Sequence, residues 1–77
     1  MGKLVQRKAF DHPAMALEAE AAFHAPGFAI PGIEISTKVV EQEGQVWLIL
    51  SQKGGLVTNI EAVLPDWELV SFEPDAP

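Results

Sequence analysis

The clearest pattern along the chain is an amphipathic helix over residues 11–24, DHPAMALEAEAAFH. Asp11 is a suitable N-cap because its carboxylate accepts hydrogen bonds from unpaired backbone N–H groups, and Pro13 falls in the first turn, where its missing N–H costs little. Alanine, methionine, leucine and glutamate follow, and all four favour a helix. Glu18 and Glu20 are expected to point away from the apolar stripe that faces the core. This stripe consists of Phe10, Ala14, Leu17 and Ala21, widened by Ala16, Ala19 and Phe23.

Two segments after this helix predict β-strands. Residues 33–41 alternate between apolar and polar side chains, which is typical of a strand with one buried face. Residues 46–50, VWLIL, are apolar without a break, which is typical of a central strand covered on both sides. Glu43-Gly44 predicts a tight turn between the two strands. Because a single helix can shelter only one side of the sheet, we expect the other side to meet a second layer or another molecule.

The two ends of the chain have weaker patterns. Residues 1–9 contain KLVQRK and predict an N-terminal arm or a short edge strand, with Leu4 and Val5 as its apolar anchors. Residues 67–72, WELVSF, predict a final strand in which apolar side chains point to both faces. Residues 74–77 are expected to form a frayed tail.

Residues 56–64 are consistent with two structures. LVTNI over 56–60 fits a further strand of a meander, whereas Thr58 and Glu61 have the spacing of a capping box that opens a short second helix over 59–64. We favour the helix. The predicted fold is therefore α+β: a small antiparallel sheet of three to four strands packed against one N-terminal helix, in a single small domain over residues 1–77.

Composition limits the class of protein. The chain has 77 residues and no cysteine, which excludes a disulfide framework, a cysteine zinc site, an iron–sulfur site and a cysteine nucleophile. Hydrophobic residues make up 48% of the chain, which predicts a packed core rather than disorder. A domain of this size buries only ~60% of the surface that its unfolded chain exposes. We therefore expect a partner protein or a second copy, as in a homodimer, to add stability.

Charge is unevenly distributed along the chain, whose formal net charge is −6. Lys3, Arg7 and Lys8 are three of the five cations, and beyond them only Lys38 and Lys53 oppose eleven acidic residues. This balance disfavours nucleic acid and anionic membranes as partners and favours a protein with a basic surface. No segment approaches the ~18 consecutive apolar residues of a membrane span, and no apolar core follows the N-terminal cations as in a secretory signal. A cytoplasmic location is expected.

Few residues indicate catalysis. Asp11 beside His12 has the residue types of an oriented general base, but an N-cap role explains Asp11, and no serine or threonine lies in a nucleophile elbow. His12 and His24 are about 18 Å apart along a helix axis, too far to share one metal ion. A metal site would need two chains, or His24 together with Glu20. We predict no catalytic residue, no metal site and no cofactor.

The two tryptophans and the acidic pairs are the candidates for binding a partner. Tryptophan usually fills a core, but on an uncovered sheet face it becomes an interface anchor. Trp67 is expected to be exposed on an edge strand between two acidic residues, which offer an acidic rim to a basic partner. The candidate partner-binding residues are Trp47, Trp67, Asp66, Glu68, Glu41 and Glu43.

These observations favour a non-catalytic intracellular protein-interaction or regulatory module, such as an accessory subunit, an inhibitor or an assembly factor. It would act through an apolar sheet face with an acidic surround. The alternative is a small oligomeric enzyme or ligand-binding protein whose site lies at a subunit interface and uses His12, His24 and neighbouring acids. The first hypothesis expects binding to survive loss of both histidines but to be lost in Trp67→Ala or after charge reversal at Glu68, and the second expects the opposite.

Overall fold

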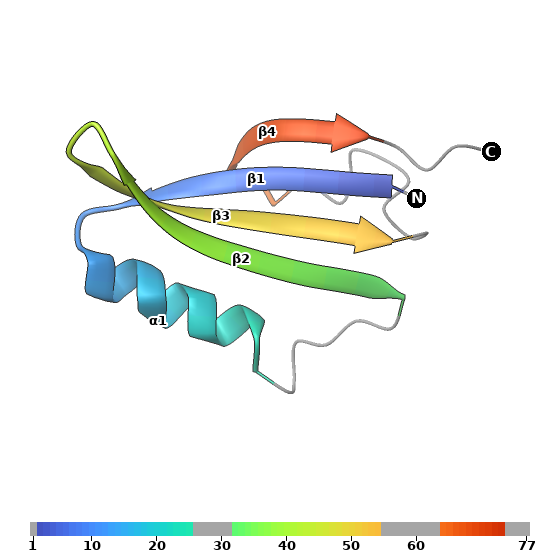
Figure 1. Ribbon diagram of the computed structural model, residues 1–77, viewed down its shortest axis with the longest axis horizontal. Coiled ribbons are helices and arrows are strands. Elements are labelled where there is room, and N and C mark those ends of the chain that lie inside the picture. The colour runs from blue at the N-terminus through green and yellow to red at the C-terminus, as the bar shows by residue number, and fades with distance from the viewer. Residues whose placement is uncertain (1, 26–31, 55–63, 74–77) are drawn as a thin grey trace.

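The computed structural model describes residues 2–25, 32–54 and 64–73, which form one helix packed against a four-stranded antiparallel sheet (Figure 1). The elements in chain order are β1 (Gly2–Phe10), α1 (Pro13–Phe23), β2 (Ile33–Gln42), β3 (Gln45–Gly54) and β4 (Glu68–Glu73). The order of strands in the sheet is β2-β3-β1-β4, and neighbouring strands are antiparallel. The predicted α+β fold is confirmed.

The N-terminal strand lies inside the sheet, so the expectation of an arm or an edge strand over residues 1–9 is wrong. β1 pairs with β3 on one side and with β4 on the other. The sequence of β1 has few apolar residues, which favours an edge position. One of its core positions is occupied by the polar residue Gln6. The side chain of Gln6 is fully buried, but its Nε2 donates to the carbonyl oxygen of Leu64 (3.2 Å) and its Oε1 accepts from the N–H of Leu64 (3.1 Å). A buried amide whose polar atoms are all paired is compatible with a core.

β2 and β3 form a hairpin around the predicted turn. Glu43 and Gly44 have φ values of 53° and 75°, as in the two-residue turns whose twist matches that of antiparallel strands, and Gln42 pairs with Gln45 across the turn. This register makes alternate residues of β2 half-buried and the residues between them exposed over positions 33–38, as the sequence pattern predicts.

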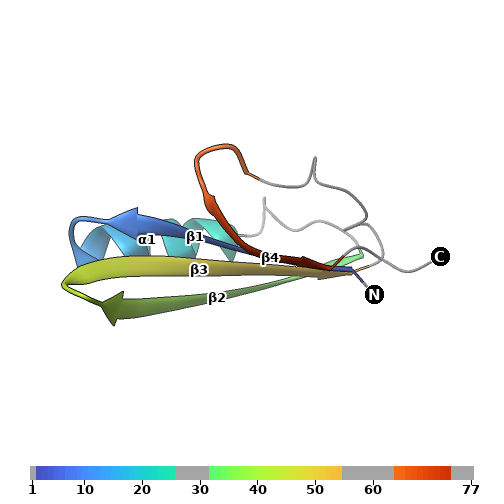
Figure 2. The same cartoon turned by 90° about the horizontal axis from the view of Figure 1, so that it is seen from above.

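The core lies between α1 and one face of the sheet, which we call the covered face. Because paired residues on neighbouring strands point to the same side, the register assigns each side chain to one face. Among the described residues, the buried apolar side chains of this core are Leu4, Ala16, Val46, Leu48 and Leu50. The opposite side is called the open face. Within residues 2–25, 32–54 and 64–73, only α1 and the segment 64–67 pack against the sheet, both on the covered face (Figure 2).

α1 begins later than the sequence pattern indicates. Its N-cap is His12, which has an extended backbone and makes no side-chain capping hydrogen bond, so the N-cap role expected for Asp11 is wrong. Pro13 occupies the start of the helix, as predicted. Its missing N–H would have had no partner within the helix at this position.

α1 presents to the sheet only the part of the predicted stripe that Ala16, Ala19 and Phe23 form, and not its centre. Ala16 is fully buried and Phe23 is half-buried, whereas Leu17 is 54% exposed. Glu20, expected to face solvent, is half-buried and accepts a hydrogen bond from Thr37 of β2. The small Ala16 allows close approach to the sheet, and the polar contacts of Glu20 favour this rotation of the helix.

The predicted strand over 56–60, the favoured helix over 59–64 and the frayed tail expected over 74–77 fall wholly or mainly outside the described residues. β4 begins at Glu68, close to the predicted start, and a bulge interrupts its pairing with β1 between Val5 and Gln6. In the part of the chain that the structure describes, no helix is long and apolar enough to cross a membrane.

Candidate functional site

The open face is an ordered array of side chains that the strand register arranges in rows across the sheet. The first row is Glu34, Lys53, Lys3 and Glu73, and the second is Ser36, Ser51, Val5 and Ser71. The third row is Lys38, Ile49, Arg7 and Glu68, and the fourth is Val40, Trp47 and Ala9. The face is therefore charged at one end, small and polar next to it, and most apolar around Trp47.

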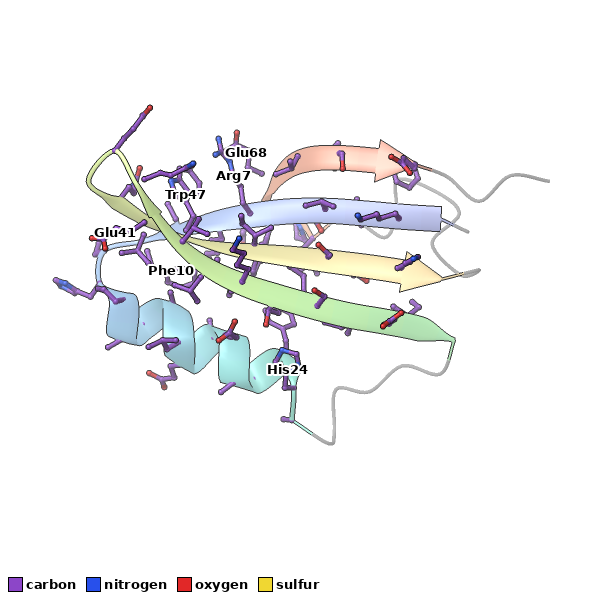
Figure 3. The ribbon with its side chains drawn as sticks, viewed as in Figure 1. Arg7, Phe10, His24, Glu41, Trp47 and Glu68 are labelled. Carbon is purple, nitrogen blue, oxygen red and sulfur yellow. The ribbon has the colours of Figure 1, made fainter. Side chains whose placement is uncertain are left out.

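Arg7 joins three strands on this face (Figure 3). Its guanidinium carbon lies 4.1 Å from the centroid of the Trp47 ring, and its Nη2 donates to Oε1 of Glu68 at 2.9 Å. A cation–π contact at a partly exposed site contributes about 0.5–1 kcal/mol. An exposed ion pair contributes less than a buried one and is screened by salt. The main effect of these contacts is to hold the tryptophan ring and the guanidinium in one geometry.

The ion pair shifts the pKa of both partners. The hydrogen bond from Arg7 lowers the pKa of Glu68 below its ordinary value, and the positive charge of Arg7 acts in the same direction. The hydrogen bond to Glu68 raises the pKa of Arg7, and the charges of Glu68 and Glu43 add to this effect. Both groups therefore stay ionised around neutral pH.

Of the six candidate partner-binding residues, the structure brings together Trp47 and Glu68, which contact Arg7 from β3 and β4, the two strands that flank β1. Trp67 lies elsewhere. Its ring packs edge-on against Phe23 of α1, with 5.6 Å between ring centroids and 82° between ring planes. Trp67 is half-buried rather than exposed because α1 reaches it, so the expectation of an exposed ring is wrong.

The other three candidates are acidic residues at the periphery. Asp66 is exposed in the turn before β4, and Glu43 is exposed in the hairpin turn. Glu41 pairs with Val46 and so belongs to the covered side of the sheet, near its end. The predicted acidic rim does not form one continuous group on the open face.

Two open-face residues, Arg7 and Ile49, did not stand out in the sequence. They are paired across β1 and β3, and both are half-buried. In the sequence of β1, Lys3, Val5 and Arg7 alternate with residues that enter the core, and this alternation places Arg7 on the open face. The alternation becomes readable only when β1 is known to be an inner strand.

The histidines were the candidates for catalysis or metal binding. Thr37 Oγ1 donates to Oε2 of Glu20 (2.9 Å), and Nε2 of His24 lies 2.7 Å from Thr37 Oγ1. Because the hydroxyl proton goes to Glu20, the imidazole is the donor to Thr37. In a nucleophilic triad the carboxylate binds the imidazole, and the imidazole accepts the hydroxyl proton. Here the carboxylate of Glu20 binds the hydroxyl group of Thr37 instead, so the three side chains are not arranged as a triad. His12 lies at the other end of α1 and does not approach His24.

Metal binding also lacks support in this region. Among the described residues, no group of three histidine, aspartate or glutamate side chains is placed to hold a metal ion. Glu20 and His24 are joined through Thr37, and the hydrogen bonds tie the C-terminal end of α1 to β2. The hydrogen bonds among Glu20, Thr37 and His24 are therefore explained by their role in holding α1 against β2.

No protein-family model matches this chain, and no curated protein or solved structure matches it either. The function is therefore argued from the geometry of the open face.

Proposed function

We propose that this protein is a non-catalytic interaction module that binds another protein through the open face of its sheet. The observation that carries the proposal is the state of Trp47 and Ile49. They belong to an inner strand whose other apolar side chains are buried, yet they are half-buried on a face that no described element covers. Tryptophan and arginine are the residue types most enriched among the energetically dominant residues of interfaces.

The rigidity of this surface supports the proposal. Trp47 and Ile49 lie on β3, which is hydrogen-bonded to a strand on each side, and Arg7 lies on β1, which is also an inner strand. Arg7 is further held by Trp47 and Glu68. Side chains that are ordered before binding lose less conformational entropy in the complex, so a preformed surface favours affinity. The proposed binding residues are Arg7, Trp47, Ile49 and Glu68.

The two tryptophans provide a matched test. Proteins that bind the wild-type chain are captured from the native host and identified, and the dissociation constant of the purified pair is measured by calorimetry. Trp47→Ala removes the ring on the open face, and we expect binding to weaken by about tenfold or more, since anchors of this kind contribute over about 1.4 kcal/mol. Trp67→Ala removes a ring of the same size that packs on α1 rather than on the open face. In contrast to the expectation from the sequence, binding is therefore expected to stay within about threefold of wild type. Unchanged binding by Trp47→Ala, or equal losses in both variants, would contradict the proposal.

The alternative of an oligomeric enzyme or ligand-binding protein has one observation in its favour, the hydrogen-bonded chain from Glu20 through Thr37 to His24. The double variant His12→Ala, His24→Ala separates the two functions. An interaction module keeps its partner affinity in this variant, whereas a subunit-interface site loses its ligand or activity. The proposal also includes a homodimer and a cytoplasmic location. Light scattering tests the homodimer, and fractionation of host cells tests the location.

A further inference from the structure

The charges of the open face restrict the chemistry of its partner. Four of the five cations of the chain lie on this face, together with three of the nine carboxylates in the described residues. The cations are Lys3, Arg7, Lys38 and Lys53, and the carboxylates are Glu34, Glu68 and Glu73. The remaining cation, Lys8, pairs with the buried Leu48 and so belongs to the covered side. The open face is thus the cationic side of an acidic protein, and this placement favours an acidic partner over the basic one expected from net charge.

A shallow hollow of about 220 Å³ lies at the charged end of the open face. Its lining is formed by two lysines, two serines and one glutamate: Lys3, Lys53, Ser36, Ser51 and Glu34. The two lysines lie directly opposite each other on β1 and β3, and the two serines lie opposite each other on β2 and β3. Two ammonium groups and two hydroxyl groups thus surround one small space, and all of them can donate hydrogen bonds.

The register places the two lysine side chains, which carry like charges, next to each other. Like charges directly opposite each other destabilise a sheet. The ion pair between Arg7 and Glu68 is the only one among the described residues, so neither Lys3 nor Lys53 has a carboxylate within 4 Å there. An acidic group placed between the two lysines would reverse this repulsion and accept hydrogen bonds from the serine hydroxyls.

The signs of the neighbouring charges determine what kind of anion fits. Glu34 of the edge strand β2 pairs with Lys53 of β3, and Glu73 of the edge strand β4 pairs with Lys3 of β1. From β2 to β4, the charges of this row are therefore negative, positive, positive and negative. Neighbouring strands are about 4.8 Å apart, so the positive strip is only two strands wide. A single acidic segment fits this strip. A nucleic-acid strand, with a phosphate at every nucleotide, would bring phosphates against the flanking glutamates.

The apolar part of the open face lies farther along the same strand. Trp47 is six residues from Lys53 on β3 and shares its face, which corresponds to about 20 Å at ~3.3 Å per residue. Resting on the proposed function, we infer that the partner presents an acidic polypeptide segment to this face. A carboxylate of the segment occupies the hollow between Lys3 and Lys53, and an apolar side chain about six extended residues away contacts Trp47 and Ile49.

Titration of the isotope-labelled protein followed by nuclear magnetic resonance tests this inference directly. The probe is a capped synthetic octapeptide of two glutamates, a four-residue glycine–serine spacer and two leucines. We expect it to shift the amide signals of Lys3, Ser51 and Lys53 and the indole N–H signal of Trp47, and to bind several-fold more weakly at high salt. The same peptide with lysines in place of glutamates is expected to leave the hollow signals unchanged. If the lysine peptide or a ten-nucleotide oligothymidylate binds these residues as tightly as the acidic peptide, the inference is wrong.

A matched pair of variants separates a local site from net charge. Lys53→Gln and Lys8→Gln remove the same charge from opposite sides of the sheet. Lys53→Gln is expected to weaken binding of the acidic peptide by about threefold or more, and Lys8→Gln to leave it unchanged. The urea midpoint of Lys53→Gln should stay close to that of wild type, since the variant relieves the repulsion from Lys3 and also loses the attraction to Glu34. Equal weakening by both variants would show a net-charge effect and overturn the inference.

The natural partner distinguishes this inference from the proposed function. If its affinity is unchanged by Trp47→Ala, the open face is not the binding surface and the proposed function fails. If its affinity falls with Trp47→Ala but not with Lys53→Gln, the proposed function stands and only the acidic partner segment is wrong. If both variants weaken binding, both are supported.

Discussion

The covered and open faces of the sheet are built from alternate residues of the same strands, yet they differ in almost every physical respect. On β3, Leu48 and Leu50 are buried beneath other elements, whereas Trp47 and Ile49 remain half-buried on the opposite side. In the described part of the chain, the covered face buries one polar side chain, Gln6, whose amide is hydrogen-bonded to Leu64. The open face mixes cations, carboxylates and serines with its apolar residues. An unbroken apolar run can therefore serve a core on one side and a surface on the other.

The largest expected difference between the faces is in stability. Leu48→Ala removes a fully buried side chain and is expected to lower the free energy of unfolding by about 2–5 kcal/mol. Ile49→Ala, the next residue along the same strand, should lower it by about 1 kcal/mol because the side chain is only half-buried. Urea unfolding followed by circular dichroism measures both. A larger loss for Ile49→Ala would show that the open face is covered in the protein in solution.

The buried amide of the covered face is the next test. Gln6→Ala leaves the N–H and carbonyl groups of Leu64 without their side-chain partner, which is expected to lower the free energy of unfolding by about 1–3 kcal/mol. Gln42→Ala, at an exposed position of β2, serves as the control and should change stability by less than about 0.5 kcal/mol. Similar urea midpoints for the two variants would contradict the role of Gln6 in holding the segment before β4.

The smallest effect belongs to the ion pair of the open face. The pKa of Glu68 is lower in the folded protein than in the unfolded chain, so its carboxylate adds stability above the unfolded pKa of about 4.3. This contribution is lost as the pH falls through the folded pKa. Glu68→Gln should therefore be slightly less stable than wild type at pH 7, and the difference should disappear in acid and shrink in high salt. Urea midpoints measured from pH 7 to pH 2.5 test this, and a difference that grows on acidification would contradict it.

The limits of the sequence as a guide to the site are clearest at the two tryptophans. Trp47 lies in a strand whose register follows from the adjacent hairpin turn, so its face is set by local alternation. Trp67 precedes β4, and its burial depends on Phe23 of α1, far away in the chain. The sequence pattern made both tryptophans candidate binding residues and favoured Trp67 as the exposed one, whereas both are half-buried and Trp47 is the one on the open face. Arg7 escaped notice for the same reason, since its contacts come from two other strands.

The sequence by itself determined the α+β class, the helix near residues 13–23, the β2–β3 turn and the three strands that follow α1, because periodicity and turn chemistry act between near neighbours. Only the tertiary structure decided that β1 lies inside the sheet and which side of α1 meets it. An alanine-rich helix has no dominant apolar side, so contacts such as that between Glu20 and Thr37 favour its rotation. The gathering of four cations on the open face likewise depends on pairing between strands far apart in the chain, which no local pattern contains.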